Sequence, residues 1–220
     1  MHLLLTDRLA CPRCGPGFGL ILRADRLTDR RVHEGALGVP NCRDAFPVVE
    51  GFAALRAPPR GALPEGLAGT AAGSGAPSDE AARAEQEGSG GPGSEADRVV
   101  ALLGIPRGPG TVALVGGPAR HAARVVEAVT DLDAVAVDPD AAGWPEEERI
   151  SRVAAWPRLP FFSASLRGVV IDGRLGRAML FEAARVTARL SRTVVVDAGA
   201  EAAEVLREAG LEVLAEEHGT

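Results

Sequence analysis

The sequence predicts an α/β protein with a doubly wound parallel sheet, preceded by a small β module. Over residues 94–220, apolar strand-like runs alternate with helical patterns, which is typical of a parallel sheet with helices on both faces. Residues 1–56 instead contain short strand-like runs around a Cys-x-x-Cys turn. Residues 57–93 are rich in Gly, Ala, Ser, Pro and Glu, a composition that predicts a flexible linker between two domains.

The composition narrows the possible functions. The 220 residues, 46% hydrophobic and 25% charged, are enough for one medium domain and a small one. Every one of the 24 basic residues is Arg, so chemistry that needs a lysine, such as Schiff-base formation, is excluded. A net charge of -6 argues against broad binding to the phosphate backbone of nucleic acids.

The sequence also indicates a compartment. No apolar run approaches the roughly 18 residues of a membrane-spanning helix, and charges interrupt the short apolar run at the start. Two of the three cysteines form a Cys-x-x-Cys, which suits a metal or redox site in a reducing compartment. We therefore expect a cytoplasmic protein without a membrane span or a signal peptide.

The centre of the predicted sheet is a βαβ unit. An apolar, β-branched run over 111–115 leads into Gly116 and Gly117. A helical pattern over 118–129 and a second apolar run over 133–137 follow. Strand, glycine turn, helix and strand in this order are typical of a nucleotide-binding unit.

Three residues of this unit are candidate cofactor ligands. Gly116 and Gly117 would let the backbone approach a ligand, and the following helix would offer free N–H groups. Asp138 ends the second strand, where an acid can accept the hydroxyl groups of a ribose. The alternatives are a plain strand-to-helix turn and an aspartate that caps the loop before Pro139.

The other expected elements follow the same alternation. Ser94 is expected to cap the first helix of the larger domain, and Gly104 is expected to end it. Asp172 and Asp197 follow later strands and are read as turn residues or, at this sheet edge, as catalytic candidates. The remaining predictions are a helix from Pro145, a short edge strand over 152–156, a strand over 166–171, a helix over 174–190, a strand over 193–196, a helix over 200–209 and a strand over 211–214.

The N-terminal module has the pattern of a metal-binding ribbon. Cys11 and Cys14 lie in a turn that precedes a predicted hairpin, and Cys42 follows the hairpin. In a zinc ribbon, thiolates from two such turns hold the ion, which replaces a core too small to be stable alone. A second Cys-x-x-Cys would need a cysteine at position 39, which is Val39. A weakened three-thiolate site and a metal-free ribbon are both open.

The residues around these cysteines resemble a known family. Residues 9–14 and 42–55 are similar to the small zinc-ribbon proteins that act as activator subunits of methyltransferases, and to a fused form in which the ribbon precedes a methyltransferase domain. The most specific part is Phe-Pro-Val-x-x-Gly after Cys42. The resemblance implies zinc. His33 and Asp44 are candidates for the fourth ligand, although neither lies at the spacing of the usual second turn.

The larger domain resembles the Rossmann-like class I methyltransferases that use S-adenosylmethionine. Residues 112–120 align with their first motif, and Asp138 falls at their ribose-binding acid. Residues 159–170 are similar to their Leu-Pro-Phe loop and fourth strand, and residues 184–197 to the next helix and fifth strand. The resemblance implies an S-adenosylmethionine site at Gly116, Gly117 and Asp138.

The departures from this family concentrate on the ligand contacts. The acid of the first motif is replaced by Leu114, and two of its glycines by Pro118 and Arg120. The acid expected near the adenine is Ala155, and the acid of the fourth strand is Arg167. We expect Arg120 to extend into the ligand channel. Because methyl transfer depends on holding donor and acceptor in line, these losses would remove most of the activity.

Three functions remain open at this stage. The first is a non-catalytic binding or scaffold protein with a degenerate S-adenosylmethionine site, acting on a protein partner, such as an active methyltransferase, or as a homo-oligomer. The second is an active methyltransferase with a divergent pocket. The third is another nucleotide-binding or redox protein built on the same sheet.

Overall fold

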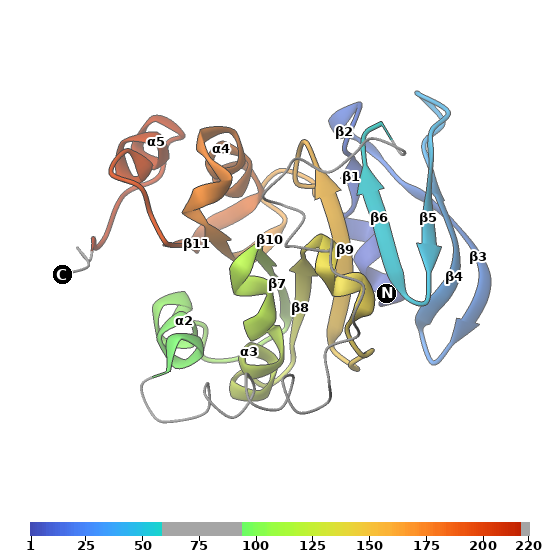
Figure 1. The fold of residues 1–220 in the computed structure, drawn as a ribbon, viewed down its shortest axis with the longest axis horizontal. Helices are drawn as coiled ribbons and strands as arrows, with labels where there is room; N and C mark the ends of the chain where they lie inside the picture. The colour runs from blue at the N-terminus through green and yellow to red at the C-terminus, as the bar shows by residue number, and fades with distance from the viewer. Residues whose placement is uncertain (59–93, 217–220) are drawn as a thin grey trace, which may run out of the picture.

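The computed structural model describes residues 1–58 and 94–216 (Figure 1). It is an α/β protein with a nine-stranded sheet and a separate two-stranded sheet. The predicted fold class, a Rossmann-like doubly wound sheet preceded by a small β module, is confirmed. The predicted linker lies outside the described residues from residue 59 to residue 93.

The N-terminal part is mostly β structure. Its elements are the 3-10 helix η1 (Leu3–Arg8), β1 (Ala10–Cys11), β2 (Gly15–Gly19), β3 (Ile21–Thr28), β4 (Arg31–Gly38), β5 (Ala45–Val49) and β6 (Phe52–Arg56). The strands β3 and β4 form an antiparallel hairpin, and β5 and β6 continue the antiparallel series. The predicted hairpin after Cys14 is present.

The larger part alternates strands and helices. Its elements are α2 (Glu95–Leu103), β7 (Gly110–Val115), η2 (Gly117–His121), α3 (Ala122–Ala128), β8 (Leu132–Val137), η3 (Pro139–Gly143), β9 (Ile150–Trp156), β10 (Leu166–Asp172), η4 (Gly173–Leu175), α4 (Arg177–Val186), β11 (Thr187–Val196) and α5 (Ala202–Glu208). As predicted, Ser94 caps α2 by accepting from the N–H of Asp97, and Gly104 ends it with φ 61°. Among the described residues, no helix is long and apolar enough to cross a membrane.

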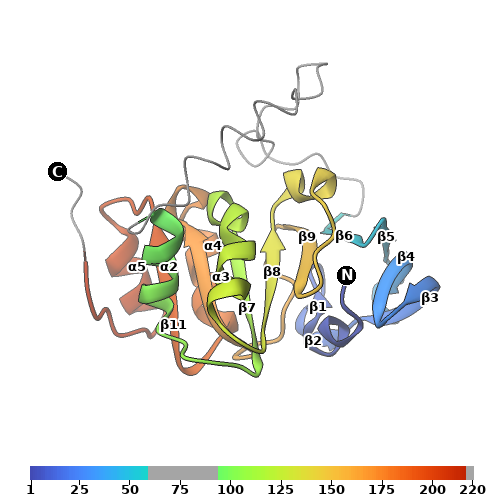
Figure 2. The ribbon, with the colours of Figure 1, turned by 90° about the horizontal axis from the view of Figure 1, so that it is seen from below.

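The strand order across the large sheet is β11, β10, β7, β8, β9, β6, β5, β4, β3. In Figure 2 these strands follow one another across the molecule, with the β3–β4 hairpin at the end far from α5. All neighbours from β11 to β6 are parallel, and those from β6 to β3 are antiparallel. The chain reverses its direction of travel across the sheet between β7 and β10, which is where ligands bind in doubly wound sheets.

Both faces of the central strands are buried. In β7, Val112 and Leu114 pack into one core cluster with residues of α2 and α3. The alternate residues Ala113 and Val115 belong to the second cluster, together with residues of α4 and α5. Burial on both faces explains why β7 has an uninterrupted apolar sequence instead of an alternating one.

The N-terminal strands are continuous with the large sheet. Residues 52–56 of β6 pair in parallel with residues 152–156 of β9. The predicted edge strand is therefore an internal strand, and the prediction of an edge position was wrong. Local patterns in β9 cannot reveal a neighbour that comes from the other end of the chain. Leu9 and Phe46 of the N-terminal part share one core cluster with Phe161 and other residues of the larger part.

Three predictions about elements of the larger part were wrong. The chain over 145–149 is not helical; it connects η3 to β9 while Glu146 turns towards the amino group of Met1 and towards His33. Residues 211–214 form no strand, because they do not pair with the sheet edge at β11. The helix expected to reach Leu190 ends at Val186, and the β-branched Thr187 begins β11.

Candidate functional site

The glycine turn lies at the carboxyl end of β7, as predicted. Gly116 has φ +73°, and its N–H donates to the carbonyl of Val137 at 3.0 Å. A Cβ added to Gly116 would lie 3.1 Å from the Cβ of Asp172 and 3.2 Å from Cδ1 of Leu175. Glycine is therefore required both by the backbone conformation and by the close approach of the loop after β10.

A carboxylate of the protein itself covers this turn. Asp172 ends β10, and its side chain is only 7% exposed. It accepts hydrogen bonds from the backbone N–H of Arg174 at 2.9 Å and from the Arg174 guanidinium at 2.6 Å, and from the backbone of Gly117. Asp172 thus occupies the N–H donor of the turn that would otherwise be available to an anionic ligand.

Arg174 holds this carboxylate in place. Its guanidinium lies 2.6 Å from Asp172 and 3.2 Å from Asp197, so it joins the ends of β10 and β11. Both aspartates were predicted at this edge of the sheet, whereas Arg174 was not. Both aspartates are paired with Arg174, which agrees with the alternative interpretation that they are turn residues.

The protonation of Asp172 leads to the first prediction. Burial alone would raise its pKa, but the hydrogen bonds from Arg174 and from Gly117 together hold the pKa below its ordinary value. Its contribution to stability is therefore present above the ordinary carboxyl pKa of about 3.9 and is lost as the pH falls through the lower folded value. Asp172→Asn is expected to lower stability at pH 7 and to flatten the acid limb of a stability–pH profile measured by urea unfolding.

The matched control is Asp25→Asn, because Asp25 is 56% exposed and its ion pair with Arg23 lies on the surface within the same strand. Its profile should follow that of the wild type within error. An Asp172→Asn profile that also follows the wild type would show that the Arg174 contact does not stabilise the folded state.

Asp138 caps the next loop. It lies directly after β8, and its Oδ1 accepts from the N–H of Asp140 at 2.8 Å at the start of η3. Burial, together with the neighbouring Asp140 charge, raises the pKa of Asp138 above its ordinary value. The structure therefore brings Asp138 to the expected edge of the sheet and gives it the loop-capping role that was the alternative to ribose binding.

The replaced motif positions point away from the turn. Arg120 does not extend into a ligand channel as expected; its guanidinium lies 2.7 Å from Glu95 of α2. Arg167 donates to the carbonyl of Pro109 at 2.8 Å, near the amino end of β7. The nearby His121 is buried 3.5 Å from Glu95, and burial lowers its pKa. None of the three side chains supplies the carboxylate that a bound methionine amine would need.

Two cavities lie elsewhere on the molecule. One of about 470 Å³ lies where the N-terminal strands meet η3 and β9, and one of about 440 Å³ lies between η1 and the amino ends of β7 and β8. Gly116, Gly117 and Asp138 line neither of them. The predicted cofactor residues therefore share an edge of the sheet without forming either cavity.

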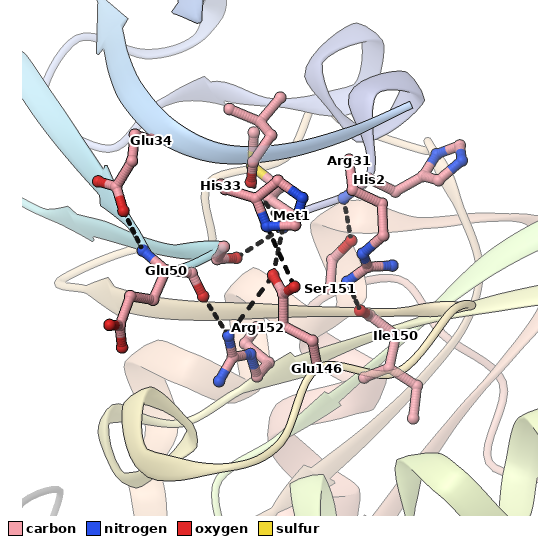
Figure 3. Close-up of polar contacts among 12 residues, drawn as sticks. Met1, His2, Arg31, His33, Glu34, Glu50, Glu146, Ile150, Ser151 and Arg152 are labelled. Atoms are coloured by element: carbon pink, nitrogen blue, oxygen red, sulfur yellow. Dashed lines mark hydrogen bonds and ion pairs between the residues drawn. The ribbon is translucent and has the colours of Figure 1, made fainter. Parts of the chain in front are cut away.

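The first cavity adjoins a polar junction that the sequence did not predict (Figure 3). Glu146 lies 3.2 Å from Nδ1 of His33 on β4 and 3.8 Å from the guanidinium of Arg152 on β9. The only local signal was one arginine inside the apolar strand 150–156. Glu146, expected in a helix that begins at Pro145, is instead part of the contact between the N-terminal strands and the larger part.

The three cysteines come together, as predicted. The Sγ atoms of Cys11 and Cys42 lie 3.8 Å apart, and those of Cys11, Cys14 and Cys42 all lie within 4.8 Å of one another. Two thiolates that bind one tetrahedral ion at about 2.3 Å are separated by about 3.8 Å. The cluster therefore fits a single metal ion in its spacing and its donor type.

Hydrogen bonds support the first cysteine turn. The N–H of Cys14 donates to Sγ of Cys11 at 3.2 Å, and Nδ2 of Asn41 donates to Sγ of Cys14 at 3.3 Å. The Asn41 bond lowers the pKa of Cys14, whereas burial raises the pKa of Cys42 to about 11. Such N–H to sulfur bonds orient the ligands of a metal site.

The two expected fourth ligands are not at this cluster. His33 faces Glu146 at 3.2 Å, and Asp44 is held by Arg13 at 3.2 Å. Neither belongs to the metal-ligating group formed by the cysteines in the described part of the chain. Neither candidate therefore completes the cluster, as their spacing in the sequence indicated, and each is engaged by another side chain.

The fold and these two sites define a Rossmann-like α/β protein whose glycine turn is covered by its own Asp172 and whose N-terminal part carries a three-cysteine cluster. No protein-family model matches the chain, and no curated protein matches it either.

Proposed function

We propose that this chain is a non-catalytic, methyltransferase-like scaffold protein that binds a protein partner. The observation that carries the proposal is the Asp172 carboxylate over the glycine turn. Asp172 and Leu175 lie against Gly116, and Asp172 accepts a hydrogen bond from the Gly117 backbone. An S-adenosylmethionine molecule would have to displace these groups and break the bidentate pair with Arg174.

The chemistry of the edge also supports this function. A methyl donor needs a carboxylate for its amine and in-line positioning of the acceptor. The position that carries this carboxylate in the resembling enzymes is the buried Leu114. Asp138, the best remaining contact, is already bonded to the Asp140 backbone. The chain retains the shape of the fold without the contacts that hold the donor.

A surface suited to a partner lies at the opposite end of the sheet. The outer strand β3 exposes Ile21 and Leu27 at 62% and 48%, and β5 exposes Val49 at 54%. Exposed apolar side chains on and near an edge strand are typical of contact surfaces between proteins. The resemblance implies an active methyltransferase as the class of partner.

Titration calorimetry with S-adenosylmethionine tests the proposal, which is the second prediction. The full-length protein is expected to give no binding heat at millimolar ligand, and Asp138→Ala is expected to behave in the same way. Micromolar binding that Asp138→Ala abolishes would overturn the scaffold function in favour of an active enzyme. Binding of NAD or a nucleoside phosphate instead would assign the turn to another nucleotide.

The variant Arg174→Ala provides a matched comparison. It removes the guanidinium that fixes Asp172 but leaves Gly116, Gly117 and Asp138 unchanged. If the missing carboxylate contacts are the reason for the lack of binding, this variant also gives no heat. A signal only in Arg174→Ala would show that the Asp172 pair blocks an otherwise competent cofactor site.

A further inference from the structure

The second cysteine turn is formed without its usual first ligand. Val39 stands at the position that would complete a second Cys-x-x-Cys with Cys42. The turn is closed by the N–H of Val39 donating to the carbonyl of Asp44 at 3.0 Å, and the N–H of Arg43 donating to the carbonyl of Val39 at 2.8 Å. The backbone therefore has the closed shape of a metal-binding turn, while the side chain is apolar.

Val39 is part of the core beneath the cysteines. It is 3% exposed and belongs to the same cluster of buried residues as Cys11, against which Cys14 and Cys42 pack. An isopropyl group in this position can neither ligate an ion nor hydrogen-bond a water molecule that does. The described residues thus offer three soft thiolates and no fourth His, Cys, Asp or Glu ligand.

The donor set discriminates between ions. Structural zinc is almost always tetrahedral and takes four protein ligands. Thiolates also select Cu(I), a soft ion that is stable with fewer than four of them. We propose that the cluster of Cys11, Cys14 and Cys42 selects a soft monovalent ion of the Cu(I) type over zinc, and that Val39 sets this selectivity.

The cysteine cluster lies in the N-terminal part, several strands away from the glycine turn in the sheet. Val39 and Cys42 lie between β4 and β5 in the chain. Three strands, β8, β9 and β6, separate β5 from β7 in the sheet (Figure 1). Its metal preference is therefore independent of whether Gly116 approaches a cofactor. Failure of the calorimetric test would leave the metal proposal standing, and the reverse also holds.

The test is a competition between zinc and Cu(I) for the reduced, full-length protein without oxygen, read by native mass spectrometry after addition of a zinc chelator. The wild type is expected to retain one Cu(I) per chain and to lose zinc. Val39→Cys is expected to hold zinc more tightly, on the order of a hundredfold, because a fourth thiolate completes the tetrahedron. Cys42→Ser is expected to retain neither ion.

The matched control is Val39→Ser, which has nearly the size of cysteine but adds no thiolate. It should not gain zinc, and circular dichroism should show both Val39 variants folded. Titration with Co(II) gives a second reading, since only Val39→Cys should show the spectrum of a tetrahedral thiolate site.

Two results would overturn the proposal. The first is a wild-type protein that retains zinc against the chelator as well as Val39→Cys does. The second is a wild-type protein that retains zinc while Asn41→Ala does not. The side-chain amide of Asn41, turned by 180°, would then present its oxygen as the fourth ligand. In that case Asn41, and not Val39, would decide which ion is bound.

Discussion

Replacement of Arg152 by methionine is expected to lower the free energy of unfolding by about 3 to 5 kcal/mol, the cost typical of breaking a buried charged contact from one side. Arg152 is 4% exposed. Its guanidinium donates to the carbonyls of Glu50 and Trp144 and lies 3.8 Å from Glu146. Without it, these acceptors remain inside the junction with no donor of comparable strength.

Urea unfolding followed by tryptophan fluorescence measures this effect, since Trp144 lies in the junction and Trp156 ends β9. Arg23→Met is the control, because Arg23 is 76% exposed on β3 and its ion pair with Asp25 lies on the surface. The control is expected to change stability by less than about 0.5 kcal/mol. Equal and small effects of both substitutions would show that the junction does not hold the two parts together.

The second large effect is expected on removing the N-terminal strands. A fragment of residues 94–220 is expected to lose cooperative thermal unfolding and to be largely insoluble. It would leave β9 without its β6 neighbour, so a row of backbone groups becomes an unpaired edge. It would also uncover Val153 and Phe161, which are fully buried in the core cluster shared with the N-terminal residues.

Co-expression of residues 1–58 and 94–220 as two separate chains is the matched experiment. The two chains are expected to co-purify, and together they should restore a cooperative transition measured by circular dichroism. If the fragment 94–220 alone melted cooperatively at the temperature of the full chain, the N-terminal strands would be an independent domain. This is the arrangement that the composition of residues 57–93 predicts.

The elements of the fold that could be predicted are those that depend on residues close together in the sequence. The apolar runs of β7, β8 and β10, the cap at Ser94 and the stop at Gly104 were recognised because each depends on neighbouring residues. The pairing of β6 with β9 joins residues about a hundred positions apart, and no periodicity encodes it. The irregular segment around Glu146 was missed for the same reason, since its partners lie on β4 and β9.

The candidate sites divide in the same way. The cysteine cluster was predictable, because Cys-x-x-Cys is a local motif and the turn at Cys42 follows one hairpin later. The position of the glycine turn was also predicted correctly. The carboxylate that covers the turn was not predicted, because Asp172 and Arg174 lie more than fifty residues further along the chain. The engagement of His33 by Glu146 likewise depends on a contact across the sheet.

The parallel pairing of β6 with β9 has a consequence for assembly. These two strands are neighbours in the sheet, although residues 52–56 and 152–156 are about a hundred positions apart in the sequence. A second copy that offered its own β6 to β9 would make the same backbone hydrogen bonds, and its Glu50 carbonyl would accept from Arg152 in the same way. Such an exchange would be favoured as the protein concentration rises.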